Sequence, residues 1–355
     1  MEKAPVPYPP VLHSLASAST ITWLIHQKFE LSIPLYRQEK EWEALGLRLS
    51  RATMSNWLLV VYRDWLVHIV HRLKLELLKQ RYLHIDETHV QVLKEPGRKN
   101  TSDSYMWVYC SIRDAVNPIR YFEYQPGRSG KYPEAFLREY EGYIHTDAYS
   151  GYNAVSGVKR CLCYTHLRRA FVDALPKDIH NSEASKPAEA ILRLNQLFNI
   201  ESELEALPPD QKKKERLIRE KPLLEAFWSW AEKSAIGELP KSKLSKAFHY
   251  ALNNREGFWN YLEDGNCSIS NSLAENCIRP FVIGRKNWLF SGSPKGAEAS
   301  AGIYTLVETA KANGLAPMKY IKYILSDMPG SAFLEHPEYL DDYLPWNPLV
   351  KEFCR

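Results

Sequence analysis

Three acidic residues, far apart in the chain, have the type and placement of metal-binding carboxylates. Asp86 lies within or at the end of an expected strand in IDET, Asp147 follows another in HTDAYSGY, and Glu275 lies on an expected helix in SLAENCIRP. Carboxylates at strand ends project into the crevice where α/β enzymes place their sites. Hard divalent cations such as Mg2+ bind carboxylate oxygens, water and substrate phosphate, so acids from three segments could form one site.

Each acid also has a purely structural explanation. Asp86 and Glu87 could be exposed strand residues, and Asp147 could begin a turn. The spacing Ser272-x-x-Glu275 fits a capping box at a helix start. Surface carboxylates are common, so the three positions carry weight only through their arrangement on strand, strand and helix.

An α/β pattern surrounds these acids. Three successive strands are predicted at 82–93, 104–114 and 118–125, because these segments are aromatic and β-branched, alternate in part and are separated by turns. Further along the chain we expect a helix, two strands and a helix, at 132–140, 143–146, 159–164 and from about His166. This order indicates a mixed sheet with flanking helices.

Two helices are predicted before the strands. One, at 36–45, ends at Gly46, and Ser50 is placed as the N-cap of a second that begins at Arg51. Two helices joined by a short Gly-containing turn are typical of a helix-turn-helix, whose second helix can enter a DNA major groove. The range 35–81 contains nine basic and five acidic residues, which gives a local net charge of +4. The alternative is a plain helical hairpin with a solvated face.

Composition permits a nucleic-acid partner without requiring one. The 355 residues carry 46 Lys and Arg against 42 Asp and Glu, a net charge of +4, and 45% are hydrophobic, which excludes global disorder. Six Cys without paired spacings exclude a disulfide scaffold and indicate a reducing, cytoplasmic compartment. The stretch 57–70 is too short and too charged to span a bilayer, and the first residues do not form a signal peptide, so no membrane partner is expected.

Longer motifs make the pattern specific. IDETHVQVL, HTDAYSGY, CYTHLRRAF and SLAENCIRPFVIGRKNWLFSGSPKGAEASAGIYTLVETAKANG resemble a DDE transposase of the insertion-sequence sixty-six family, and the resemblance runs from Leu35 to LDDYLPWNP. It implies a ribonuclease-H-like mixed sheet with Asp86, Asp147 and Glu275 as the catalytic, metal-binding triad. Asp147 follows Asp86 by 61 residues and Glu275 follows Asp147 by 128. The long second gap fits a charged helical insertion in the catalytic fold.

The resemblance also implies a reaction and its partners. Mg2+, or Mn2+ in its place, would support release of a 3′-OH at the transposon end and its direct attack on target DNA, without a covalent protein–DNA intermediate. The expected partners are transposon-end and target DNA, further copies of the chain and accessory element proteins. Family members usually carry a Cys-rich zinc-binding region before the helix-turn-helix. Nothing of that kind precedes Leu35, so we expect a truncated or divergent member.

Further residues are candidates for supporting roles. Cys163-Tyr-Thr-His166 could be a zinc half-site, but a structural site needs four ligands and no partner pair is spaced for it, so no zinc is expected. His166 would instead support the active site or pack at a helix start, and Arg279 could orient Glu275 one helical turn away. Trp288 and Phe290 are expected in the core rather than stacked on DNA. The candidate phosphate contacts are Arg48, Arg51, Arg168, Arg169, Arg285, Lys286 and Lys295.

The chain is thus expected to have six parts. An N-terminal extension and helix (1–34) precedes a helix-turn-helix region (35–81) and the first catalytic part (82–175). A helical insertion (176–267), the completion of the catalytic domain (268–315), and a C-terminal helix with an acidic tail (316–355) follow. The basic run 212–216 within the insertion is read as a solvated helix face, because eight basic and nine acidic residues lie in 201–241. The competing functions are a structure-directed nuclease on the same fold and a catalytically silent DNA-binding remnant. A glycosidase with paired carboxylates is a more distant alternative.

Overall fold

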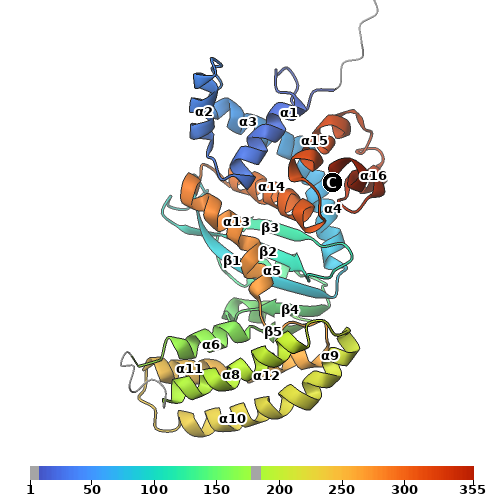
Figure 1. Cartoon of the computed structure of the whole chain (residues 1–355). Coiled ribbons are helices and arrows are strands. Elements are labelled where there is room, and N and C mark those ends of the chain that lie inside the picture. Colours follow the sequence, from blue (N-terminus) through green and yellow to red (C-terminus); the bar gives the residue numbers. More distant parts are fainter. Residues whose placement is uncertain (1–7, 177–184) are drawn as a thin grey trace, which may run out of the picture. The chain divides into compact units, whose positions relative to one another are not determined.

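The computed structural model describes residues 8–176 and 185–355, and the chain divides into two compact units. Unit 1 comprises residues 1–80, 86–129 and 274–355, and unit 2 comprises 81–85 and 130–273. Residues 1–7 of the expected N-terminal extension and 177–184 of the expected insertion lie outside the described residues. Figure 1 labels the elements of both units.

A six-stranded mixed sheet has the order β3-β2-β1-β4-β5, with β6 paired to β1. Strand β2 is antiparallel to β3, whereas β4 is parallel to both β1 and β5. The strands are β1 Tyr82–Val92, β2 Asp103–Ser111, β3 Arg120–Gln125, β4 Gly142–Thr146, β5 Val158–Leu162 and β6 Phe290–Ser291. The predicted mixed α/β arrangement is therefore confirmed, and β6 is an addition that the sequence pattern did not indicate.

Several predicted boundaries were wrong. The strands expected at 104–114 and 118–125 are β2, which ends at Ser111, and β3, which begins at Arg120. The helix expected at 132–140 is α5, Lys131–Phe136, and it ends early because Glu139 adopts a left-handed conformation that turns the chain into β4. The strand expected to reach Tyr164 ends at Leu162, and Tyr164 is instead the first residue of α6, Tyr164–Val172. The fully buried Tyr164 hydroxyl donates to the Phe258 carbonyl at 2.8 Å, which fixes this helix start against the insertion helices.

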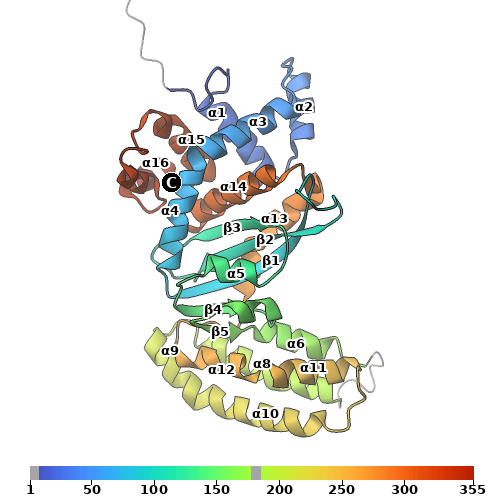
Figure 2. The ribbon, with the colours of Figure 1, turned by 180° about the vertical axis from the view of Figure 1, so that it is seen from behind.

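The helices of unit 1 surround the larger part of the sheet. α13 lies across β1 and β2 in both views (Figures 1 and 2). The helices of unit 1 are α1 Ala18–Ile25, α2 Leu35–Ala44, α3 Arg51–Val61, α4 Val67–Leu78, α13 Ser272–Trp288, α14 Pro294–Ala312, α15 Pro317–Asp327 and α16 Pro348–Cys354. Helix α13 starts two residues before the last segment of the unit begins.

Local signals set the ends of α2 and α3 as predicted. Gly46 takes a positive φ of 84° after α2, and the Ser50 hydroxyl accepts a hydrogen bond from the Thr53 amide at 3.1 Å as the N-cap of α3. The second helix is longer than a simple helix-turn-helix requires, because a π-helical turn at Tyr62–Leu66 joins α3 directly to α4. The two helices and their turn thus exist as expected, with α3 extended through α4.

Helix α14 lies alongside the edge strand β3 in both views and covers its edge (Figures 1 and 2). The hydroxyls of Thr305 and Thr309 accept hydrogen bonds from the amides of Phe122 and Arg120, at 2.8 and 3.1 Å. An uncovered edge would leave these amides open to pairing with another chain. The side chains of α14 therefore complete the sheet on this side.

The helices of unit 2 enclose a core of their own. It includes Phe171, Leu194, Trp228 and Phe248, all fully buried. Besides α5 and α6, the helices are α8 Lys186–Glu203, α9 Pro209–Glu215, α10 Lys221–Ala235, α11 Lys243–Asn253 and α12 Arg255–Trp259. The described residues between α6 and α13 are mainly helical. Among all described helices, none combines the length and apolarity needed to cross a bilayer.

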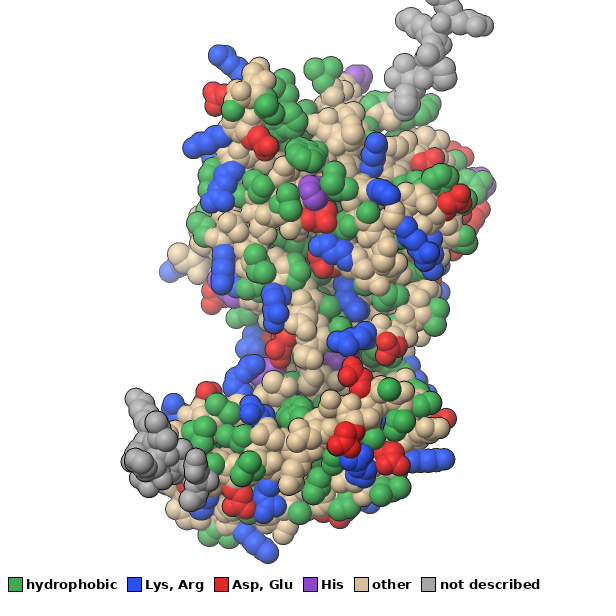
Figure 3. Space-filling view, viewed as in Figure 1, with side chains coloured by type: hydrophobic (Ala, Val, Ile, Leu, Met, Phe, Trp, Pro, Cys, Tyr) green, Lys and Arg blue, Asp and Glu red, His purple; other side chains and the backbone are tan. Residues whose placement is uncertain are grey.

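Arg216 corrects the expectation that the run 212–216 is a solvated face. Lys213 and Lys214 are exposed, and Figure 3 shows basic and acidic side chains mixed over the surface of the insertion helices. The Arg216 side chain, by contrast, is fully buried. Its guanidinium donates to both Glu201 carboxylate oxygens, at 2.5 and 2.8 Å, and to three backbone carbonyls. These belong to Tyr261, Asp264 and Cys267. The residue ties the insertion to the segment that leads toward α13.

A second acid in this network makes the stability of the protein pH-dependent. Burial, followed by the Glu201 charge, raises the pKa of Glu220 from 4.5 to about 8, and the Tyr261 hydroxyl donates to Glu220 at 2.6 Å. Since the folded state holds a proton that the unfolded state releases, this contribution is complete below about pH 4.5 and is lost as the pH rises toward 8. We expect Glu220→Gln to flatten the fall in melting temperature between pH 5 and 8.

The matched control is Glu225→Gln, on an exposed site of α10. Melting curves of the three proteins at each pH provide the measurement. An unchanged pH slope in Glu220→Gln would show that Glu220 is ionised in the folded state.

Candidate active site

Asp86 lies on β1 and is half-buried. Its Oδ1 accepts the Glu87 amide at 2.9 Å. The neighbouring Glu87 has a different role, because its buried carboxylate is paired with Arg128 at 2.6 Å. Side chains two residues apart on a strand share a face, so Asp86 projects on the same side of the sheet as His84. Of the two acids in IDET, Glu87 is the one held in an ion pair with a basic side chain that the structure shows.

Asp147 directly follows β4 and is also half-buried. Its Oδ1 accepts the Tyr149 amide at 3.0 Å, so the turn expected as the structural alternative is present. Arg160 on β5 donates to the carbonyls of Asp147 and Tyr149, at 2.6 and 2.8 Å, and to the Thr146 hydroxyl at 2.7 Å. Arg160, which was not among the predicted site residues, therefore fixes the backbone that carries Asp147.

Unit 2 contains a buried polar network built around His84 and His145. The rings of His84 and His145 stack with centroids 4.2 Å apart, and each histidine precedes its aspartate by two residues. Asn271 bonds to His84 Nδ1 at 2.9 Å and donates to the Ile85 carbonyl at 2.8 Å, while the Ser268 amide donates to His145 Nε2 at 2.8 Å. The shared His-x-Asp spacing was the available sequence signal, but it was not used.

Removal of the Asn271 amide is expected to lower stability by about 2–4 kcal/mol, because it leaves the buried Ile85 carbonyl and His84 nitrogen without this partner. Urea unfolding of Asn271→Ala measures the effect. Asn276→Ala, at an exposed position one helical turn further on, is the control and should change stability by less than about 0.5 kcal/mol. Equal stability of the two variants would refute the assigned role.

The Cys-x-x-His motif holds the entry to α13. Cys163 Sγ accepts the Asn271 amide at 3.1 Å. Burial opposes ionisation of Cys163, but hydrogen bonds from His166 and from the Asn271 amide outweigh it and lower the pKa of the thiol. His166 is half-buried on the first turn of α6. Within unit 2 the motif therefore positions the loop that precedes α13.

Glu275 lies in the first turn of α13, and the helix begins at Ser272. Ser272 is thus inside the helix rather than at its N-cap, which removes the expected capping box as the reason for Glu275. Two residues further on, the Cys277 thiol hydrogen-bonds Cys110 of β2. Burial, the contact with Cys277 and the nearby Asp86 charge all raise the pKa of Cys110. Within unit 1, Cys277 of α13 therefore contacts Cys110 of β2, whose pKa the charge of Asp86 also raises.

The basic segment after Glu275 is divided between buried and exposed positions. Arg285 is half-buried, donates to the Thr88 hydroxyl at 3.1 Å, and has its pKa lowered by burial, so it is attached to β1. Arg279, Lys286 and Lys295 are exposed. Trp288 packs edge-on against Phe281, which agrees with its expected core position.

Phe290 contradicts the expectation that both aromatic residues belong to the core. It is 45% exposed on β6 and pairs with Gln91 of β1. Phe290 thus belongs to a two-residue strand that pairs with the last residues of β1, Gln91 and Val92.

The remaining predicted DNA contacts differ in accessibility. Arg168 donates to Asn195 of α8 at 2.7 Å and is half-buried, whereas Arg169 is exposed. Arg48 and Arg51 are exposed around the turn between α2 and α3. Glu39 reaches the same turn and accepts the Arg51 amide at 2.9 Å, so this surface is of mixed charge.

Two thiols of unit 2, Cys161 on β5 and Cys267, lie close to each other and to His145 on β4. Ligand-type atoms of His145, Cys161 and Cys267 lie within 4.8 Å of one another. The hydrogen bond from Cys161 lowers the pKa of Cys267 to about 6, against the effect of burial and with help from His145. Both ring nitrogens of His145 form hydrogen bonds with backbone groups, one with the Leu83 carbonyl and one with the Ser268 amide, so each nitrogen already has a protein partner. Sequence spacing gave no hint that Cys161 and Cys267 meet.

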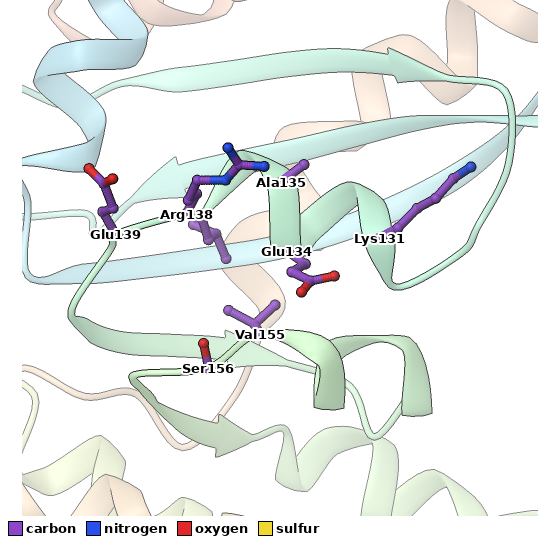
Figure 4. A pocket seen from close by; sticks show the side chains of 8 residues that line it. Lys131, Glu134, Ala135, Arg138, Glu139, Val155 and Ser156 are labelled. Carbon is purple, nitrogen blue, oxygen red and sulfur yellow. The ribbon is translucent and has the colours of Figure 1, made fainter.

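The hollow drawn in Figure 4 is separate from these acids. Its volume is about 370 Å³, and α5 together with Val155 and Ser156 forms its walls. Lys131, Glu134, Arg138 and Glu139 all line it, so its walls carry two basic and two acidic side chains. None of the predicted site residues lines it.

Comparison with known proteins identifies the family. Three proteins of Sinorhizobium fredii (strain NBRC 101917 / NGR234) are similar over nearly the whole chain. "Uncharacterized protein y4hP" is 25% identical over 98% of this chain and 65% of its own length, y4qI is 28% identical over 94% and 63%, and y4jD is 25% identical over 97% and 68%. The chain thus spans about two thirds of these relatives. Residues 13–299 match the family described as Transposase IS66 family, to which this chain belongs.

Proposed function

We propose that the protein is a DNA transposase that cuts transposon ends and joins the freed 3′-OH to target DNA, with Asp86, Asp147 and Glu275 as ligands of catalytic divalent metal. The observation that carries the proposal is the placement of these three acids on β1, after β4 and on α13, in a chain whose residues 13–299 match the transposase family. Strand-borne and helix-borne carboxylates in this order favour a ribonuclease-H-like catalytic fold.

The register of the parallel strands supports a shared site. His84 of β1 pairs with His145 of β4. Asp86 and Asp147 each follow their histidine by two residues, so the 61-residue spacing of the acids equals the offset of the strand register. Continued for two residues, this register would bring the two carboxylates to neighbouring positions on adjacent strands. A one-residue slip would send one of them to the opposite face.

The third ligand is proposed from its place in the fold. Glu275 lies in the first turn of α13, and it follows the two strand-borne acids in the chain. An all-oxygen set of three carboxylates suits Mg2+ or Mn2+ rather than a soft metal.

The residues of the chain would divide the work of the reaction. Bound divalent metal supplies Lewis acidity for the attacking and leaving oxygens of the phosphodiester. Arg160 donates to the carbonyl of Asp147, and Asn271 donates to the carbonyl of Ile85, the residue before Asp86, so both aspartates would be oriented before DNA binds. The exposed Lys286 and Lys295 would attract the phosphate backbone. The scheme requires no nucleophilic side chain, and the fully buried Tyr152 is a structural residue.

The helices α2 and α3 are the proposed DNA-anchoring region. Arg48 and Arg51 stand on the exposed side of the turn between them. Because Glu39 and Glu43 adjoin Arg48 there, we infer that this region reads a defined site rather than binding any duplex by charge alone.

The test is a cutting and joining assay with the full chain and labelled duplexes from the DNA that flanks its coding sequence. With Mg2+ we expect both end cleavage and covalent joining to a target plasmid, and with EDTA neither. Cleavage without joining would favour the structure-directed nuclease. Binding without metal-dependent cleavage would favour the silent remnant.

A further inference from the structure

The segment between α13 and α14 exposes two large apolar side chains in a basic surrounding. Leu289 is 63% exposed and Phe290 is 45% exposed. Four basic residues and no acidic residue lie between Arg279 and Lys295. Soluble proteins expose single apolar side chains often, but two consecutive ones within a cationic segment favour a polyanionic partner that also offers apolar surface. Nucleic acid has both properties, because its bases have π-faces.

Leu289 occupies a conformation that a leucine disfavours. Its φ is +66°, and its amide donates to the Arg285 carbonyl at 2.8 Å at the end of the helix. Glycine is the usual residue at such a helix end, because it lacks the Cβ that makes this conformation costly. Leucine here gains little burial, so neither folding nor packing explains why it stands in this position.

The two residues rest on a rigid base. Phe290 and Ser291 pair with Gln91 and Val92 of β1, and the Leu93 amide donates to the Ser291 carbonyl at 2.9 Å. Ser293 then caps α14 by accepting the Gly296 amide at 3.2 Å. An apolar tip held by a strand and between two helices can press into a base stack without itself giving way.

We propose that Leu289 and Phe290 form a wedge that enters the DNA near the cleavage site, unstacks one base and stacks against it. The inference rests on the proposed function and adds to it a residue pair that distorts the substrate. Apolar side chains inserted at a base step are a known means of opening and bending a duplex. The exposed Lys286 and Lys295 would hold the phosphates on either side.

The strand predicts where the distortion falls. Asp86 and Gln91, the partner of Phe290, are five residues apart on β1. At about 3.3 Å per residue this is about 17 Å. Because successive nucleotides of one strand rise about 3.4 Å, the distorted base should lie about five nucleotides from the phosphate cut at Asp86.

The first test is 2-aminopurine fluorescence, with the probe placed singly three to seven nucleotides from the cleavage site in EDTA, so that no cutting occurs. The wild-type chain should raise the fluorescence at least about threefold at one position near the fifth, and Phe290→Ala and Leu289→Gly should abolish the rise. Leu192→Ala, which removes a leucine that is equally exposed on α8, should leave the rise intact. No rise with the wild-type chain at any position, under saturated binding, overturns the wedge.

The second test is rescue by the DNA. With Mg2+, Phe290→Ala should cut paired ends at least about tenfold more slowly than the wild type, and a mismatch or abasic site at the fluorescent position should restore its rate to within about twofold. Leu289→Gly should also be no less stable than the wild type, because it relieves an unfavourable φ. Wild-type rates on paired DNA for Phe290→Ala contradict the proposal, as does a defect that a mismatch leaves unchanged. If the wild type itself fails to cut, the proposed function fails, whereas the fluorescence test still decides the wedge.

Discussion

Replacement of Asp86 or Asp147 by asparagine, or of Glu275 by glutamine, is expected to reduce both end cleavage and joining at least about 100-fold. Each change keeps the size of the side chain and removes the negative charge that a divalent metal requires as a ligand. Loss of one group that stabilises transition-state charge typically costs 10²–10³ in rate. The three variants should still bind DNA, since the proposed anchoring residues Arg48 and Arg51 lie on other elements.

The matched control is Glu141→Gln, at an exposed position just before β4. It should cut and join at the wild-type rate. A gel assay of end cleavage and plasmid joining, with a binding measurement for each variant, checks the expectation. Near-normal activity in any one of the three variants would remove that residue from the proposed metal site.

Replacement of Arg216 by methionine is expected to destabilise the protein by about 3–5 kcal/mol. The fully buried guanidinium pairs with Glu201 and donates to three backbone carbonyls. Methionine has similar length but no donor, so it leaves a buried carboxylate without its counter-charge. Urea unfolding followed by circular dichroism measures the loss.

Two further variants identify its cause. Lys213→Met, at an exposed position three residues earlier, should change stability by less than about 0.5 kcal/mol. The double variant Arg216→Met with Glu201→Leu should regain part of the loss, because it removes the unpaired carboxylate. An Arg216→Met protein as stable as the wild type would show that the buried ion pair contributes nothing to the fold.

The elements that the sequence predicted well depend on local signals. The end of α2 at Gly46 and the N-cap of α3 at Ser50 arise from backbone conformation and one hydrogen bond between near neighbours. The strands β1 to β3 carry aromatic and β-branched residues, and β2 and β3 are buried along most of their length. Such features are visible within a few residues of sequence, so they could be predicted without knowledge of the fold.

The features that the sequence did not reveal depend on distant partners. Arg216 stands in a charged run and differs from Lys213 only because Glu201 and three carbonyls from residues 261–267 surround it. Asn271 is recognisable as a central residue only once β1 and β4 lie side by side. Phe290 was misassigned because its exposure depends on the pairing of β6 with β1, which two residues of strand do not indicate.

The central claim is that these carboxylates bind the catalytic metal, and a metal switch at Asp147 tests it most directly. Thiolate sulfur is a poor ligand for Mg2+, whereas the softer Mn2+ tolerates it better. We predict that Asp147→Cys neither cuts nor joins DNA in Mg2+ and recovers at least about tenfold in Mn2+, while Glu141→Cys behaves as the wild type in both metals. Equal activity of Asp147→Cys in Mg2+ and Mn2+, at the level of the wild type, would contradict the claim.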